Sequence, residues 1–209
     1  MQSAKIFKIV VNVIRSTLIF AMLASIFYSS WQNLFISLLT LILTFLPAWI
    51  EKKYKINIPL DFGLIIVLFV YASLFLGEIN KFYYYFWWWD IFLHTVSAIA
   101  FASIGFVILF MLFKTNKIQS KPIWIAIFSF CFSLSIGVIW EIFEFFMDSF
   151  FGLNMQKSGL MDTMWDLISN CVGAITASLI GFIYMKGNQK SYLSKLVDFL
   201  IKSNSVLKY

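Results

Sequence analysis

Long apolar windows recur along the chain, separated by short segments that carry most of the charged residues. Each window is long enough to cross about 30 Å of hydrocarbon as a helix that rises about 1.5 Å per residue. The windows fall at residues 9–27, 34–50, 60–76, 91–113, 123–146 and 164–185. The pattern therefore predicts an all-α fold, a polytopic bundle of about six transmembrane helices.

The composition agrees with a protein that is dissolved in lipid. The sequence is 61% hydrophobic and only 12% charged, which is more apolar surface than a soluble fold can bury. The two cysteines, Cys131 and Cys171, both lie within apolar windows. We interpret them as packing residues rather than as redox or metal-binding groups.

The distribution of lysines predicts the orientation. The net charge is +6, but the lysines cluster between apolar windows, which indicates membrane orientation rather than nucleic-acid binding. If the helices alternate in direction, the clusters at Lys5, Lys52 and Lys114 and the lysines of the tail fall on one side, and Lys81 and Lys157 fall on the other. The positive-inside rule then places both termini in the cytoplasm.

Two further segments are expected at the membrane surface. Residues 80–90 contain three tyrosines and three tryptophans, which is typical of an aromatic belt at the outer interface. Residues 186–209 mix leucine, isoleucine and valine with lysine in the pattern of an amphipathic helix. We therefore expect a transmembrane domain over residues 1–185 and a cytoplasmic amphipathic tail over residues 186–209.

Acidic residues and the single histidine gather at the outer ends of the last three predicted helices. They are Asp90 and His94 at the fourth window, Glu141, Glu144 and Asp148 at the fifth, and Asp162 and Asp166, with the amide Asn170 after them, at the sixth. Spacings of three and four place each set on one helix face. Because the fourth and sixth helices run inward and the fifth runs outward, all three sets reach the same leaflet. Residues 90–181 are therefore predicted to build one outward-facing polar site.

Ionised carboxylates are costly inside a bilayer, so this cluster must be paired with a cation, protons or water. Carboxylate oxygens with one imidazole suit a divalent cation such as Mg²⁺, Mn²⁺ or Zn²⁺, which would activate water in a hydrolase or transferase. The expected ligands are Asp90, His94, Glu141, Asp162 and Asp166. Catalytic roles are expected for His94 as ligand or base, for Glu144, and for Asn170 as an orienting group.

Two other interpretations stay open. Crowded carboxylates can hold protons and pass them along a relay, as in a proton-coupled or small-ion transporter. Alternatively, the polar cluster only specifies helix packing in a non-catalytic envelope-stress or resistance factor. Spacing alone does not separate these possibilities. Gly173, Ala177 and Gly181 form a small-residue face that predicts close packing of the sixth helix against the fourth or fifth.

Over residues 90–181 the chain resembles the VanZ-like membrane proteins. Their pattern has Asp-x-x-x-His opening one helix, Glu-x-x-Gln closing the next, and an Asp, Asp, Asn, Gly series opening the last. The counterparts here are Asp90 and His94, Glu141 and Glu144, and Asp162, Asp166, Asn170 and Gly173. This chain departs from the pattern in having glutamate at Glu144 and in offering Lys157 where the family usually carries arginine.

The chain resembles the YjdF-type inner-membrane family more closely. The shared motifs are Trp-Glu-x-x-Glu at residues 140–144 and Asp-Thr-x-Trp-Asp at residues 162–166. These resemblances imply a multi-pass protein of a prokaryotic inner membrane with a role at the cell envelope, rather than a particular reaction. The expected partners are membrane lipids and a lipid-linked or small-molecule substrate at the outer leaflet.

Overall fold

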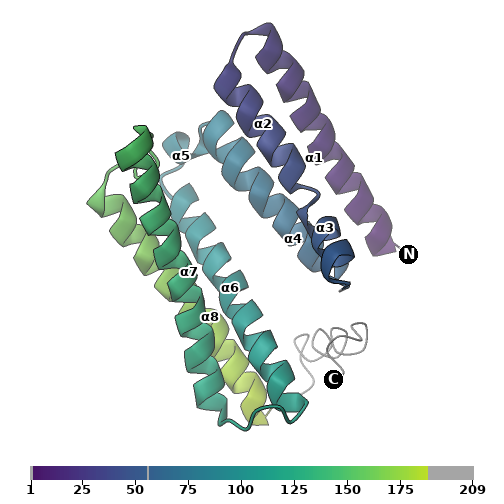
Figure 1. Cartoon of the computed structure of the whole chain (residues 1–209), viewed down its shortest axis with the longest axis vertical. Coiled ribbons are helices and arrows are strands. Elements are labelled where there is room, and N and C mark those ends of the chain that lie inside the picture. Colours follow the sequence, from purple (N-terminus) through teal and green to yellow (C-terminus); the bar gives the residue numbers. More distant parts are fainter. Residues whose placement is uncertain (1, 56, 188–209) are drawn as a thin grey trace. The chain divides into compact units, whose positions relative to one another are not determined.

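The structure is a computed structural model, and it describes residues 2–55 and 57–187 of the chain (Figure 1). All regular secondary structure in these residues is helical, which confirms the predicted fold class. The elements are α1 (Gln2–Phe27), α2 (Trp31–Leu43), α3 (Leu46–Tyr54), α4 (Leu60–Val70), the π-helix η1 (Tyr71–Ile79), α5 (Phe82–Tyr85), α6 (Trp89–Lys114), α7 (Pro122–Phe151) and α8 (Leu160–Gly187). The amphipathic tail expected after Lys186 lies outside the described residues from residue 188 onward.

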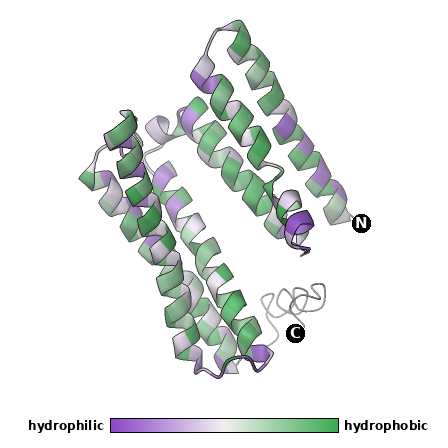
Figure 2. Ribbon diagram, viewed as in Figure 1, coloured by the Kyte–Doolittle hydropathy of each residue, from purple (hydrophilic) through white to green (hydrophobic). Residues whose placement is uncertain are grey.

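Six helical stretches within the described residues are long and apolar enough to cross a bilayer, as predicted. They are Ala4–Phe27, Trp31–Tyr54, Leu60–Ile79, Trp89–Lys114, Pro122–Phe151 and Leu160–Gly187. Figure 2 shows hydrophobic residues along most of the length of these helices. The helices extend beyond the predicted windows because their last turns carry polar residues that hydropathy alone assigns to loops.

The chain divides into two compact units, and the first extends from the N-terminus to Trp89. Its core consists of Val11, Ile14 and Leu18 of α1 together with Val67 of α4. The second span is broken between α2 and α3, where Pro47 lies in the first turn of α3 and has no N–H to donate. At this break the backbone carbonyl of Thr44 bonds to a polar group from a neighbouring helix.

Arg15 of α1 supplies that group. Its Nη2 atom donates to the carbonyl oxygen of Thr44 at 3.1 Å, and its Nε atom donates to the Thr44 hydroxyl at 3.1 Å. The guanidinium carbon also lies 3.7 Å from the centre of the Phe45 ring. A cation within the first span is thus held by hydrogen bonds and an aromatic face, as intramembrane charges require.

The second unit, from Asp90 onward, contains α6, α7 and α8, which run side by side (Figure 1). Two serines of α7 bond to the α6 backbone: Ser129 Oγ donates to Ala102 O, and Ser133 Oγ donates to Ala98 O at 2.8 Å. Gly173 lets α8 approach the α6 backbone closely, because a Cβ atom there would lie 2.4 Å from the Thr95 carbonyl oxygen. Small residues therefore hold the three helices in backbone contact.

Candidate metal centre

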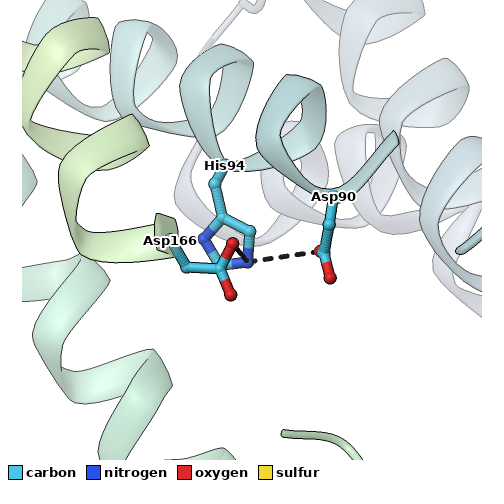
Figure 3. Close-up of side chains that lie close together, drawn as sticks. All are labelled: Asp90, His94 and Asp166. Carbon is cyan, nitrogen blue, oxygen red and sulfur yellow. Dashed lines mark ion pairs between the residues drawn. The ribbon is translucent and has the colours of Figure 1, made fainter. Parts of the chain in front are cut away.

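His94 lies near the start of α6, and carboxylates surround its ring. Its Nε2 atom is 3.6 Å from Asp90 Oδ1 and 3.8 Å from Asp166 Oδ1, and its Nδ1 atom is 3.8 Å from Glu141 Oε1. Figure 3 shows Asp90 approaching from the preceding turn of the same helix and Asp166 approaching from α8. The imidazole, with 11% of its side chain exposed, is thus the point at which groups from α6, α7 and α8 meet.

Two overlapping groups of side chains are spaced as metal ligands could be. Asp90, His94 and Asp166 each offer one ligand atom within 4.8 Å of the others, and so do Glu141, Glu144 and Asp166. Asp166 belongs to both groups. Oxygen and imidazole donors of this kind suit Mg²⁺, Mn²⁺ and Zn²⁺, so the residues present fit the predicted divalent cation.

Glu141 is the group in the cluster that most clearly lacks a partner. It is only 4% exposed, and neither of its carboxylate oxygens has a donor in hydrogen-bonding geometry among the described residues, although the Thr163 hydroxyl approaches it. Glu144, by contrast, accepts a hydrogen bond from the Trp140 indole nitrogen at 3.0 Å. Because a buried carboxylate without donors is strongly unfavourable, Glu141 requires a proton or a cation at this position.

Asn170 lies at the base of the cluster, wedged between α6 and α7. Its Nδ2 atom is 3.4 Å from His94 Nδ1. On the other side it packs against Gly137, where a Cβ atom would lie 2.7 Å from the same amide nitrogen. Only a glycine at residue 137 leaves room for the amide, so Asn170 is fixed against the histidine ring.

The connection between α7 and α8 carries a lysine to the cluster. The Asp148 carboxylate accepts hydrogen bonds from the backbone N–H groups of Met155 and Gln156, at 2.7 and 2.8 Å, and so folds the connection back. Lys157 follows directly, and its Nζ atom lies 2.5 Å from Asp90 Oδ2. The ammonium group therefore neutralises the outermost carboxylate of the cluster.

The residues predicted for the site fall into two sets. Asp90, His94, Glu141, Glu144, Asp166 and Asn170 lie together at this end of the second unit. Asp162 lies one turn before Asp166 on α8, half-buried and outside both ligand groups. Its role as a ligand stays a prediction.

Sequence reasoning missed the contributions of Gly137 and of the Trp140 indole, and it named Lys157 only as the residue that stands where the VanZ-like pattern carries arginine. The spacing of four residues between Trp140 and Glu144, and between Gly137 and Glu141, is a signal that could have placed both near the site. Lys157 gives no such signal, because its position depends on how Asp148 folds the connection.

The fold and this cluster define a helical membrane protein with a group of carboxylates around one histidine. The chain matches the family described as Predicted membrane protein (DUF2238) over residues 10–187, and it belongs to that family. An uncharacterised protein of Thermotoga maritima is 28% identical over 142 residues, which cover 68% of this chain and 71% of that protein. No solved structure matches the chain. The family match includes all three helices that carry the cluster.

Proposed function

We propose that the second unit binds a divalent cation, Mg²⁺, Mn²⁺ or Zn²⁺, and uses it to activate water for hydrolase or transferase chemistry on an envelope lipid or a lipid-linked precursor. One observation carries the proposal: the buried Glu141 carboxylate has no hydrogen-bond donor among the described residues, and it lies within a set of potential ligand atoms. A cation at this point would satisfy Glu141 and relieve the repulsion among its neighbours.

We assign different roles to the members of the cluster. Asp90, Glu141 and Asp166 are the proposed ligands, and His94 is either a further ligand through Nε2 or the general base. When His94 Nε2 faces a cation, His94 Nδ1 carries the proton. The Asn170 amide can then turn its oxygen toward this N–H group and accept a hydrogen bond from it. Asn170 would thereby fix the tautomer and the ring orientation of His94, as outer-shell groups do in metal sites.

Glu144 is the proposed proton-transfer group. It is 9% exposed, and the Trp140 indole holds one of its oxygens at 3.0 Å. A carboxyl group that is both positioned and next to the ligand set can receive a proton from an activated water.

Three features support a substrate from the membrane. Trp140 and Trp165, which flank the cluster on α7 and α8, are 46% and 53% exposed on the outer surface of the unit, and indole rings favour the headgroup level of a bilayer. The lysine distribution assigns this end of the helices to the outer leaflet. The VanZ-like and YjdF-type resemblance supports a place at the cell envelope of a prokaryotic inner membrane.

A proton relay across the membrane has less support. Residues 95–113, 122–140 and 171–185, which make up the rest of the three spans, contain no Asp, Glu, His, Lys or Arg. The serines of α7 that lie there donate to backbone carbonyls of α6. A relay that began at the cluster would therefore have no carboxylate, imidazole or basic side chain to continue it through these helices.

The test is a reconstitution in proteoliposomes made from a bacterial lipid extract, followed by lipid mass spectrometry. With Mg²⁺, Mn²⁺ or Zn²⁺ supplied, we expect the wild-type protein to consume a lipid species, and to stop when the cation is chelated. Glu141→Gln should be inactive, whereas Glu78→Gln, which changes an exposed carboxylate of η1, should behave like wild type. Lipid turnover that persists in Glu141→Gln or in chelator, or no turnover with any of the cations, would contradict the proposal.

A further inference from the structure

The two ligand groups of the second unit share one residue and are otherwise distinct. Asp90 and His94 of α6 belong to one group, Glu141 and Glu144 of α7 belong to the other, and Asp166 of α8 lies within reach of both. We infer that this end of the unit binds two divalent cations, bridged by the carboxylate of Asp166. The inference rests on the proposed function and extends it from one cation to a pair.

Charge balance favours a pair. Apart from Asp148, whose carboxylate accepts two backbone hydrogen bonds, this end of the unit carries five carboxylates, including Asp162 one turn from Asp166, and one lysine, Lys157. When ionised with a neutral histidine, these groups have four net negative charges. One divalent cation balances half of that charge and two balance all of it. In an apolar setting, where unbalanced charge is costly, the second cation removes repulsion that the first leaves.

The distances are close to those that each cation requires. Two ligands about 2.1 Å from the same cation lie about 3 to 3.5 Å apart. His94 Nε2 is 3.6 Å from Asp90 Oδ1 and 3.8 Å from Asp166 Oδ1, so closure by a few tenths of an ångström brings each carboxylate to that separation from the imidazole, and the ligand atoms of all three residues lie within 4.8 Å of one another. A carboxylate with two oxygens can serve both cations at the separation of about 3.5–4 Å found in two-metal sites.

The second group carries the observation that points to a second ion. Both oxygens of Glu141 are buried without a hydrogen-bond donor among the described residues. A cation held only by Asp90, His94 and Asp166 would bond neither of these oxygens. The Nδ1 atom of His94 lies 3.8 Å from Oε1, which is beyond hydrogen-bonding distance. A cation between Glu141 and Glu144 supplies the missing partner, and Glu144 is then a ligand in place of the proton-transfer role proposed above.

The two positions differ in chemistry. The first includes an imidazole and is suited to Mn²⁺ or Zn²⁺, whereas the second offers carboxylate oxygens alone and is suited to Mg²⁺ or Mn²⁺. Mn²⁺ fits both, and it is paramagnetic, so a bridged pair differs from two isolated ions in its electron paramagnetic resonance spectrum. It is therefore the probe of choice.

The experiment titrates Mn²⁺ into the full chain in lipid nanodiscs, with calorimetry for stoichiometry and electron paramagnetic resonance for coupling. We expect two equivalents and an exchange-coupled spectrum in wild type and in the Glu78→Gln control. Glu144→Gln and Asp90→Asn, which each alter one group, should each bind one equivalent with an uncoupled spectrum.

The outcomes separate the pair from the single cation. One equivalent and an uncoupled spectrum in wild type would overturn the pair and leave the single-cation proposal standing. No bound Mn²⁺ would overturn both. Two equivalents with an uncoupled spectrum would place the second ion elsewhere and would also overturn the bridged pair. The wild-type measurement decides these cases even where a variant fails to fold.

Discussion

Gly173→Ala tests whether the close approach of α6 and α8 sets the geometry of the cluster. The added Cβ would lie 2.4 Å from the Thr95 carbonyl oxygen and 2.9 Å from the Ala98 Cβ. Ordinary contact begins near 3.4 Å, so the two helices must separate by about 1 Å at this level. Overpacking of this kind costs about 1–3 kcal/mol of unfolding free energy.

The same separation has a consequence for cation binding, because Thr95 is the neighbour of His94. His94 Nε2 lies 3.8 Å from Asp166 Oδ1 across the α6–α8 contact. Two ligands of one cation cannot be more than about 4.2 Å apart when each bond is about 2.1 Å long. A displacement of about 1 Å exceeds this limit and removes one ligand. We expect the dissociation constant for Mn²⁺ to rise at least tenfold.

The assay combines thermal unfolding, followed by tryptophan fluorescence in detergent, with a Mn²⁺ titration. Gly187→Ala is the matched control, because it makes the same change in the same helix at a site where a Cβ would meet nothing within 4 Å. It should leave stability and Mn²⁺ affinity near wild type. If Gly173→Ala unfolds at the wild-type temperature and binds Mn²⁺ with wild-type affinity, the reasoning that links helix approach to the site is refuted.

Two further predictions concern the cationic side chains Arg15 and Lys157. Arg15→Leu leaves the Thr44 carbonyl at the α2–α3 break without the guanidinium donor. We therefore expect the unfolding free energy to fall by about 1–3 kcal/mol, measured by thermal or denaturant unfolding. Unchanged stability would show that another donor bonds this carbonyl. Lys157→Met keeps the aliphatic part of the side chain but removes the positive charge 2.5 Å from Asp90 Oδ2. Because the ammonium group no longer competes for this carboxylate, we expect Mn²⁺ to bind a few-fold more tightly in a calorimetric titration. Weaker binding would mean that Lys157 acts by orienting Asp90.

The helices could be predicted from hydropathy because a bilayer leaves a chain few alternatives to a long apolar helix. The breaks within spans two and three could not be located in the same way. The end of α2 depends on Pro47 and on the Arg15 hydrogen bonds to Thr44 from another helix. The π-helix η1 continues α4 without any polar or glycine signal at Tyr71. A hydropathy profile is an average over a window of at least about one helical turn. It therefore does not register these changes at single residues.

For the site, spacing along single helices carried most of the information. Asp90 and His94 are four residues apart, and Glu141 and Glu144 are three residues apart. These spacings are enough to place each pair on one helix face. Contacts between helices carried the rest. No local sequence pattern shows that Gly137 makes room for Asn170 or that Lys157 folds back onto Asp90. Both contacts result from packing between helices.

The measurement that tests the central claim most directly is the metal content of the protein purified without chelator, by inductively coupled plasma mass spectrometry. The comparison is among wild type, the double variant His94→Gln/Glu141→Gln and the control Glu78→Gln, each after dialysis with Mg²⁺, Mn²⁺ or Zn²⁺. Cation binding by the cluster predicts at least one equivalent in wild type and in the control, and its loss in the folded double variant. Wild-type protein that retains no divalent metal, or a double variant that retains as much as wild type, would contradict it.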